Sequence, residues 1–191
     1  MRLLSTRAFA LALLLPAGAA AEAMPEPPAI GAAVPDFEGV SLQGQPVSLR
    51  SALTGHKAVV VLFLSTVCPY ANYFAGHLRE LDAAYGPRGV LFVGVYSNNW
   101  ESKQEVAEHA RGRGFAFPMI KDDGHAIADL LGASRTPEAF LVDSEGRLRY
   151  RGWVKSKQES PDLQRALDAV LEGRPVRRSA TKAFGCAVDR Y

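Results

Sequence analysis

An alternation of strand-like and helix-like segments constrains the fold of this chain more than any other feature. Residues 57–64 form a nearly continuous apolar run, which is typical of a strand buried on both faces of a sheet. A helical spacing of apolar residues follows over residues 69–85, and a second buried strand is predicted over residues 90–96. Another helix is predicted over residues 102–113, opening at a possible N-cap, Ser102. Strands joined through helices pair in parallel, so this order predicts a parallel core.

Short elements on either side of this core complete a predicted α/β fold. We expect hairpin strands at 37–42 and 46–49, a strand at 117–120, a helix at 126–131, hairpin strands at 139–143 and 148–152, and a closing helix at 161–171. The later hairpin adds antiparallel strands to the parallel ones. The prediction is therefore a mixed central sheet with helices on both faces.

The first residues have the pattern of a secretory signal peptide. Arg2 and Arg7 give a basic start, an apolar run follows, and small residues precede an expected cleavage near Ala21 or Ala23. We expect a signal peptide at 1–21, a Pro/Ala-rich linker at 22–29, the folded domain at 30–173 and a basic C-terminal tail at 174–191. The protein is therefore expected to be exported, either periplasmic or secreted, with no membrane span in its mature form.

The charge balance argues against a nucleic-acid partner. The whole chain has 22 basic and 20 acidic residues, and residues 1–21 hold two arginines and no acidic residue. The expected mature protein is therefore neutral and lacks the overall positive charge of nucleic-acid-binding domains. Basic residues gather near the C-terminus and are interpreted as a solvated tail: Arg174, Arg177, Arg178 and Lys182.

Cys68 lies where the first buried strand gives way to a helix. The positive end of a helix dipole and its unpaired N–H groups stabilise a thiolate, the reactive form of cysteine. Cys186 is the second of two cysteines in the chain and lies on the tail. Export to an oxidising compartment permits a disulfide between the two without requiring one.

At this point the chain resembles the thioredoxin-like redoxins, in particular the alkyl hydroperoxide reductase/thiol-specific antioxidant branch. The matching segments are Val34-Pro35-Asp36-Phe37, the run from Phe63 to Cys68-Pro69, the run from Thr136-Pro137 to Asp143, and Ala183-Phe184-Gly185-Cys186. The resemblance implies a thioredoxin-like fold with Cys68 at the start of the first long helix. It also implies that Thr136-Pro137 faces the cysteine, with Pro137 in the cis form.

The resemblance favours peroxide reduction over disulfide exchange. Ser65 stands where a Cys-x-x-Cys motif has its first cysteine, and peroxiredoxins carry Ser or Thr at that position. Cys68 is then the nucleophile, Ser65 hydrogen-bonds the peroxide or thiolate, and Arg135 stabilises developing charge. A sulfenic acid on Cys68 would condense with Cys186 as the resolving cysteine. Val61 stands where the peroxiredoxin signature has a proline, so the match is partial.

Other interpretations stay open from the sequence. The chain is alternatively a thiol–disulfide oxidoreductase, with Cys186 or a partner thiol as the second sulfur. It is alternatively a non-catalytic thioredoxin-like module that binds a protein or a metal. Cys186 can equally be an inert tail thiol, and Arg135 a surface arginine. Substrates are expected to be peroxides or disulfides, with an unidentified thiol reductant for recycling.

No cofactor or metal is expected. Copper-binding relatives use two neighbouring cysteines and a distant histidine, and Cys68 has no neighbouring cysteine. His77 falls on the opposite helix face, and His125 is interpreted as a loop residue at a helix start. His56 and His109 are interpreted as surface residues.

Overall fold

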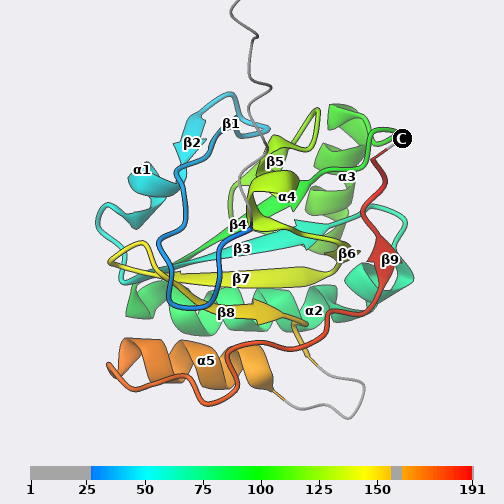
Figure 1. Cartoon of the computed structure of the whole chain (residues 1–191). Helices are drawn as coiled ribbons and strands as arrows, with labels where there is room; N and C mark the ends of the chain where they lie inside the picture. The colour runs from blue at the N-terminus through cyan, green and yellow to red at the C-terminus, as the bar shows by residue number, and fades with distance from the viewer. Residues whose placement is uncertain (1–26, 156–160, 191) are drawn as a thin grey trace, which may run out of the picture.

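The computed structural model describes residues 27–155 and 161–190 and contains a five-stranded mixed sheet (Figure 1). The predicted signal peptide and most of the linker lie outside these residues. The strand order is β5-β4-β3-β7-β8, with β3, β4 and β5 parallel and β7 and β8 antiparallel. The bounds are β3 Ala58–Leu64, β4 Val90–Tyr96, β5 Met119–Lys121, β7 Glu138–Asp143 and β8 Leu148–Gly152. The predicted mixed sheet is confirmed.

Helices cover both faces of this sheet, as predicted. The side chains of β3 alternate between the two faces, because Val60 and Leu62 join one core cluster while Val59 and Val61 join the other. The first cluster contains the apolar faces of α2 Pro69–Tyr85, α3 Lys103–Arg113 and α5 Asp162–Leu171. The second cluster lies under α1 Leu49–Leu53 and α4 Ala126–Leu131. No helix in the described part of the chain has the length and hydropathy needed to cross a membrane.

Most predicted elements occur close to their expected bounds. The first hairpin is confirmed as β1 Glu38–Val40 and β2 Pro46–Ser48. Ser102 caps α3, and its side chain and that of Glu105 form a reciprocal capping box. Four short elements are not predicted from the sequence: α1, the 3-10 helix Gly86–Arg88, β6 Arg135–Thr136 and β9 Cys186–Ala187.

The four basic residues of the C-terminal tail, Arg174, Arg177, Arg178 and Lys182, are exposed, as expected, but the segment after them is not a free tail. Strand β9 pairs antiparallel with β6, so that Cys186 lies opposite Thr136 and Ala187 opposite Arg135. Val188 is 7% exposed and belongs to the second core cluster. We call residues 183–190 the strap, and Figure 1 shows it in red running past β6. The tail therefore packs on the domain through backbone pairing and apolar burial.

Candidate active site

Cys68 is the N-cap residue of α2 and is fully buried. Pro69 occupies the first turn, where its missing N–H removes no helical hydrogen bond. The sulfur has 0% exposure, and the Cys68 thiol donates a hydrogen bond to the carbonyl oxygen of Thr136 at 2.9 Å. The strand-to-helix junction thus places the sulfur directly against β6.

Thr136 forms the facing wall of the site. The Thr136–Pro137 peptide bond is cis, as the resemblance implies. Pairing of β6 with β9 brings Cys186 to the same place, because Cys186 is the register partner of Thr136. The buried Thr136 hydroxyl has no hydrogen-bond partner among the described residues. The site is thus assembled from three segments that are far apart in the sequence.

The two cysteines have pKa values that move in opposite directions. Burial acts to raise the pKa of Cys68, but the Cys186 thiol, the Thr136 hydroxyl and the N–H groups of Ala71 and Cys186 favour the thiolate and leave its pKa lowered. Burial and the neighbouring Cys68 raise the pKa of Cys186 to about 11. Cys68 is therefore the better nucleophile, and Cys186 remains a protonated donor beside it.

Ser65 and Arg135 lie near the cysteines without contacting the Cys68 sulfur. Ser65 is 1% exposed, and within the described residues no hydrogen bond joins its hydroxyl to Cys68. Arg135 is exposed, and its guanidinium donates to the carbonyl oxygen of Gly185 at 3.5 Å. Its charge opposes the rise in the pKa of Cys186. Arg135 therefore faces the strap.

Three polar residues behind the active-site turn, Asn72, Glu101 and His109, are not assigned to the site by the sequence analysis. Asn72 donates to the carbonyl oxygen of Thr66 at 3.0 Å, and Glu101, which is 2% exposed, accepts from the Thr66 N–H. His109 lies between Asn72 and Tyr96 and is not the surface residue expected from the sequence. The helical spacing of Asn72 from Cys68 is the single weak signal that points to this group.

The pKa of His109 explains how this chain of contacts is oriented. Burial, together with the charge of Arg113, lowers the pKa of His109 to about 4, so the ring is neutral. Tyr96 then donates to His109 Nδ1 at 2.9 Å, and Nε2 donates to Asn72 at 2.6 Å. The turn before Cys68 is thereby tied to β4 and α3.

The remaining histidines do not converge on a shared site. His125 is the N-cap residue of α4, as the sequence suggests, and has a left-handed φ of 63°. His77 lies on α2 beside Glu80, and His56 contacts the Ala52 carbonyl oxygen. Across residues 27–155 and 161–190, no group of three His, Cys, Asp or Glu side chains is placed to hold a metal ion.

Two kinds of curated relative of this chain carry the names of thiol–disulfide exchange proteins. The chain is 28% identical over 119 residues to the thiol-disulfide oxidoreductase ResA of Bacillus thuringiensis (strain Al Hakam), a match covering 62% of this chain and 66% of ResA. It is 30% identical over 124 residues to the thiol:disulfide interchange protein DsbE of Escherichia coli (strain K12), covering 64% of each chain. The chain thus spans just under two thirds of the length of these relatives. They support the predicted oxidoreductase class.

Solved structures share the fold over most of the chain. A hypothetical protein, SMc02350 of Sinorhizobium meliloti 1021, matches with a TM-score of 0.78 and 27% identity, covering 85% of this chain and 94% of that one. The peroxidoxin BcpB of Mycobacterium tuberculosis matches with a TM-score of 0.61 and 24% identity, covering 75% and 96%, which shows the fold alone. The family described as Redoxin matches residues 29–168. With Cys68 at the start of α2 in a thioredoxin-like fold, this chain belongs to the Redoxin family.

Proposed function

We propose that this protein is a thiol–disulfide oxidoreductase that cycles Cys68 and Cys186 between the dithiol and disulfide forms. The observation that carries the proposal is the pairing of β9 with β6, which sets a protonated Cys186 beside a Cys68 whose pKa is lowered. The names of the ResA and DsbE relatives point to the same chemistry. This reading is supported better than the peroxide reduction that the sequence favours.

The proposed exchange needs both cysteines. The Cys68 thiolate attacks one sulfur of a substrate disulfide, forming a mixed disulfide and releasing one substrate thiolate. That thiolate takes up the proton of Cys186, whose sulfur then attacks Cys68 and releases the second substrate thiolate. Two electrons pass to the substrate, and a Cys68–Cys186 disulfide remains for an external thiol reductant to reduce. Because Cys68 is 0% exposed, a segment around it must move before a substrate sulfur can reach it, and we place that movement in the strap, which pairs with β6 beside the sulfur.

Peroxide reduction is the second candidate, favoured by the single cysteine in the Ser65-x-x-Cys68-Pro69 turn. Cys68 would then become a sulfenic acid, and condensation with Cys186 would release water and give the same disulfide. Within the described residues, neither Ser65 nor Arg135 contacts the Cys68 sulfur as that mechanism expects. The sequence motif therefore supports peroxide reduction, but the contacts of Ser65 and Arg135 with the Cys68 sulfur that this reaction needs are not seen in the described part of the chain.

We further propose that the protein works outside the cytoplasm. The pattern of residues 1–21 supports this, as does the description of one structural relative, a disulfide oxidoreductase of Mycobacterium tuberculosis, as secreted. N-terminal sequencing of protein recovered from a periplasmic extract or culture medium tests the proposal. A new terminus near Ala21 or Ala23 is expected, whereas an intact N-terminus on cytoplasmic protein would contradict it.

The exchange proposal is tested by giving the reduced full chain equimolar peptide disulfide or equimolar hydrogen peroxide. Intact mass and peptide mapping then follow the products over time. Fast formation of a Cys68–Cys186 bond with the peptide disulfide, and only the slow rate of a free thiol with peroxide, is the expected result. The Cys186→Ser variant should stop at the mixed disulfide on Cys68. Fast reaction with peroxide alone would replace the proposal with the peroxidase reading.

A further inference from the structure

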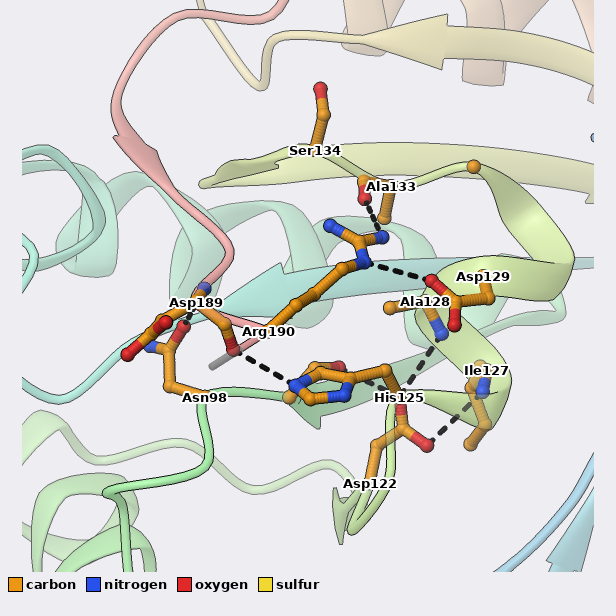
Figure 2. A network of polar contacts seen from close by, with 12 residues as sticks. Asn98, Asp122, His125, Ile127, Ala128, Asp129, Ala133, Ser134, Asp189 and Arg190 are labelled. Carbon is orange, nitrogen blue, oxygen red and sulfur yellow. Dashed lines mark hydrogen bonds and ion pairs between the residues drawn. The ribbon is translucent and has the colours of Figure 1, made fainter.

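The end of the strap beyond Cys186 is held by contacts to three separate parts of the domain. The N–H of Val188 donates to the carbonyl oxygen of Ser134 at 3.1 Å, which continues the pairing of β9. The N–H of Asp189 donates to Asn98 Oδ1 at 2.8 Å, and the Asp189 carbonyl oxygen accepts from His125 Nε2 at 2.8 Å. Figure 2 shows the side chains of Asn98 and His125 both directed at Asp189. These three hydrogen bonds therefore fix both the position and the orientation of the backbone at Val188 and Asp189.

We call Asp189 and Arg190, with the residues that hold them, the anchor of the strap, and Arg190 is its charged part. Its Nε donates to Asp129 Oδ1 on α4 at 2.8 Å, and its Nη2 donates to the carbonyl oxygen of Ala133 at 2.8 Å (Figure 2). The side chains of Arg190 and Asp129 are 34% and 30% exposed, so water screens the pair only in part. One planar guanidinium thus bridges a helix and the loop that leads into β6.

The surface that receives the anchor is itself held rigidly. Asp122 accepts hydrogen bonds from the N–H groups of Ile127 and Ala128 and from the Ser97 hydroxyl. These bonds fix the turn that carries His125, whose φ of 63° is rare for a side chain with a Cβ. Asn98, which is 2% exposed, directly follows Ser97. Asp122 therefore links Asn98 and His125, the two residues that hydrogen-bond Asp189, through one set of contacts.

The other end of the strap is fixed by an aromatic contact. Phe184 packs edge to face against Tyr70 at 5.3 Å and against Trp153 at 6.0 Å, measured between ring centroids. Cys186 lies between this contact and the anchor at Asp189 and Arg190. A thiol on a short segment fixed at both ends has a high effective concentration at its partner sulfur.

We propose that Asn98 and Arg190 are positioning residues for Cys186, which set the stability of the Cys68–Cys186 disulfide from outside the strand pair. The inference rests on the proposed function and deepens it. Neither side chain contacts a sulfur in the described structure. Each acts by holding the chain just after β9, and so limits how far Cys186 moves from Cys68. Loss of either contact widens that range and lowers the effective concentration of the thiol.

The test is the equilibrium of the full chain with glutathione. In forming the disulfide, Cys68 and Cys186 give two electrons and two protons to glutathione disulfide, which becomes two glutathione thiols. Asn98→Ala and Arg190→Ala are each expected to lower this equilibrium constant roughly tenfold, the scale of one hydrogen bond to a buried or charged group. Asn99→Ala, at the exposed neighbour of Asn98, is the matched control for Asn98→Ala. Arg174→Ala is the control for Arg190→Ala, because Arg174 is an exposed arginine that pairs with Glu172 outside the strap.

A second measurement separates positioning from general destabilisation. In reduced protein, the anchor variants are expected to speed alkylation of Cys68 by iodoacetamide roughly tenfold, while circular dichroism shows an unchanged fold. Arg190 is partly exposed, so Arg190→Ala decides the question if Asn98→Ala does not fold.

Two outcomes overturn the inference in different ways. An equilibrium constant in both anchor variants equal to that of the controls overturns it and leaves the proposed function intact. Absence of any Cys68–Cys186 disulfide in the unsubstituted chain overturns the proposed function and this inference together.

Discussion

At the scale of single residues, the two oxygen atoms of Thr136 serve different forms of Cys68. The carbonyl oxygen accepts a hydrogen bond from the thiol at 2.9 Å and so stabilises the protonated form. The hydroxyl acts to lower the pKa of Cys68 and has no hydrogen-bond partner among the described residues, so it is available to the thiolate. One residue thus offers the sulfur a partner before and after it loses its proton, which limits the energetic cost of burying either form.

We therefore predict that Thr136→Val slows the reaction of Cys68 at neutral pH. Valine keeps the shape and the backbone carbonyl but removes the hydroxyl that favours the thiolate, so the pKa of Cys68 rises. A loss of roughly three- to tenfold in rate is expected, the size of one hydrogen bond. The pH dependence of Cys68 alkylation measures it. Thr54→Val, at an exposed threonine far from the site, is the control. An unchanged pH profile would show that the Thr136 hydroxyl does not lower the pKa of Cys68.

The pKa of Cys186 gives a prediction for stability. Because burial and Cys68 raise this pKa from 9.0 to about 11, the folded state favours the protonated thiol. Its contribution is fully present below pH 9.0 and is lost as the pH rises through about 11. Denaturant unfolding of the reduced protein should therefore show a loss of stability in this window that Cys186→Ser lacks. Equal pH profiles for the two proteins would contradict the shift.

At the scale of elements, the long apolar segments are predictable and the short paired ones are not. Strand β3 has seven buried residues in a row, so its existence follows from the sequence alone. Strands β6 and β9 have two residues each and carry no periodic pattern. They exist because each supplies the other's hydrogen bonds, which is a property of the folded chain. For that reason the sequence does not predict the paired strap that follows the exposed basic residues of the tail.

Gly185 is the residue that allows β9 to approach β6. Its φ is 139°, and a Cβ at this position would overlap the carbonyl oxygen of Thr136. Gly185→Ala is therefore predicted to push the strap off β6, expose Cys68 to iodoacetamide and destabilise the protein by about 1 kcal/mol or more.

A matched glycine separates this steric effect from a general one. Gly112 lies in α3, and a Cβ there meets no atom within 4 Å. Gly112→Ala is expected to leave Cys68 protected and to raise stability by about 0.5–1 kcal/mol. If Cys68 is alkylated equally slowly in both variants, the close approach of Gly185 to Thr136 is not what holds the strap on β6.

At the scale of the whole molecule, the sequence predicts the part of the site that depends on a single local feature, the junction between β3 and α2. Cys68 follows from the passage of β3 into α2, and Thr136-Pro137 from the family resemblance. The location of Arg135 beside the strap depends on where the strap lies, which no local pattern encodes. The same holds for Glu101, which reaches the Thr66 N–H across the turn after β4. Contacts between distant segments thus decide which candidate residues meet the sulfur.

Oxidation is predicted to stabilise the entire fold. A Cys68–Cys186 disulfide would close a loop of about 120 residues and restrict the unfolded chain, which is worth about 4–5 kcal/mol for an unstrained bond. Calorimetry should therefore give a higher Tm for the oxidised protein than for the reduced one. Cys186→Ser should show no such dependence on oxidant. A lower Tm on oxidation would mean that closing the bond distorts the site.

The strap also bears on the order in which the chain folds. Cys68, Thr136 and Cys186 meet only through contacts of long sequence separation, and such contacts carry the largest loop-closure entropy. We expect the sheet around β3 to form before the strap is in place, which would leave Cys68 open in partly folded forms. Protection of this one sulfur from alkylation is then expected to mark completed folding.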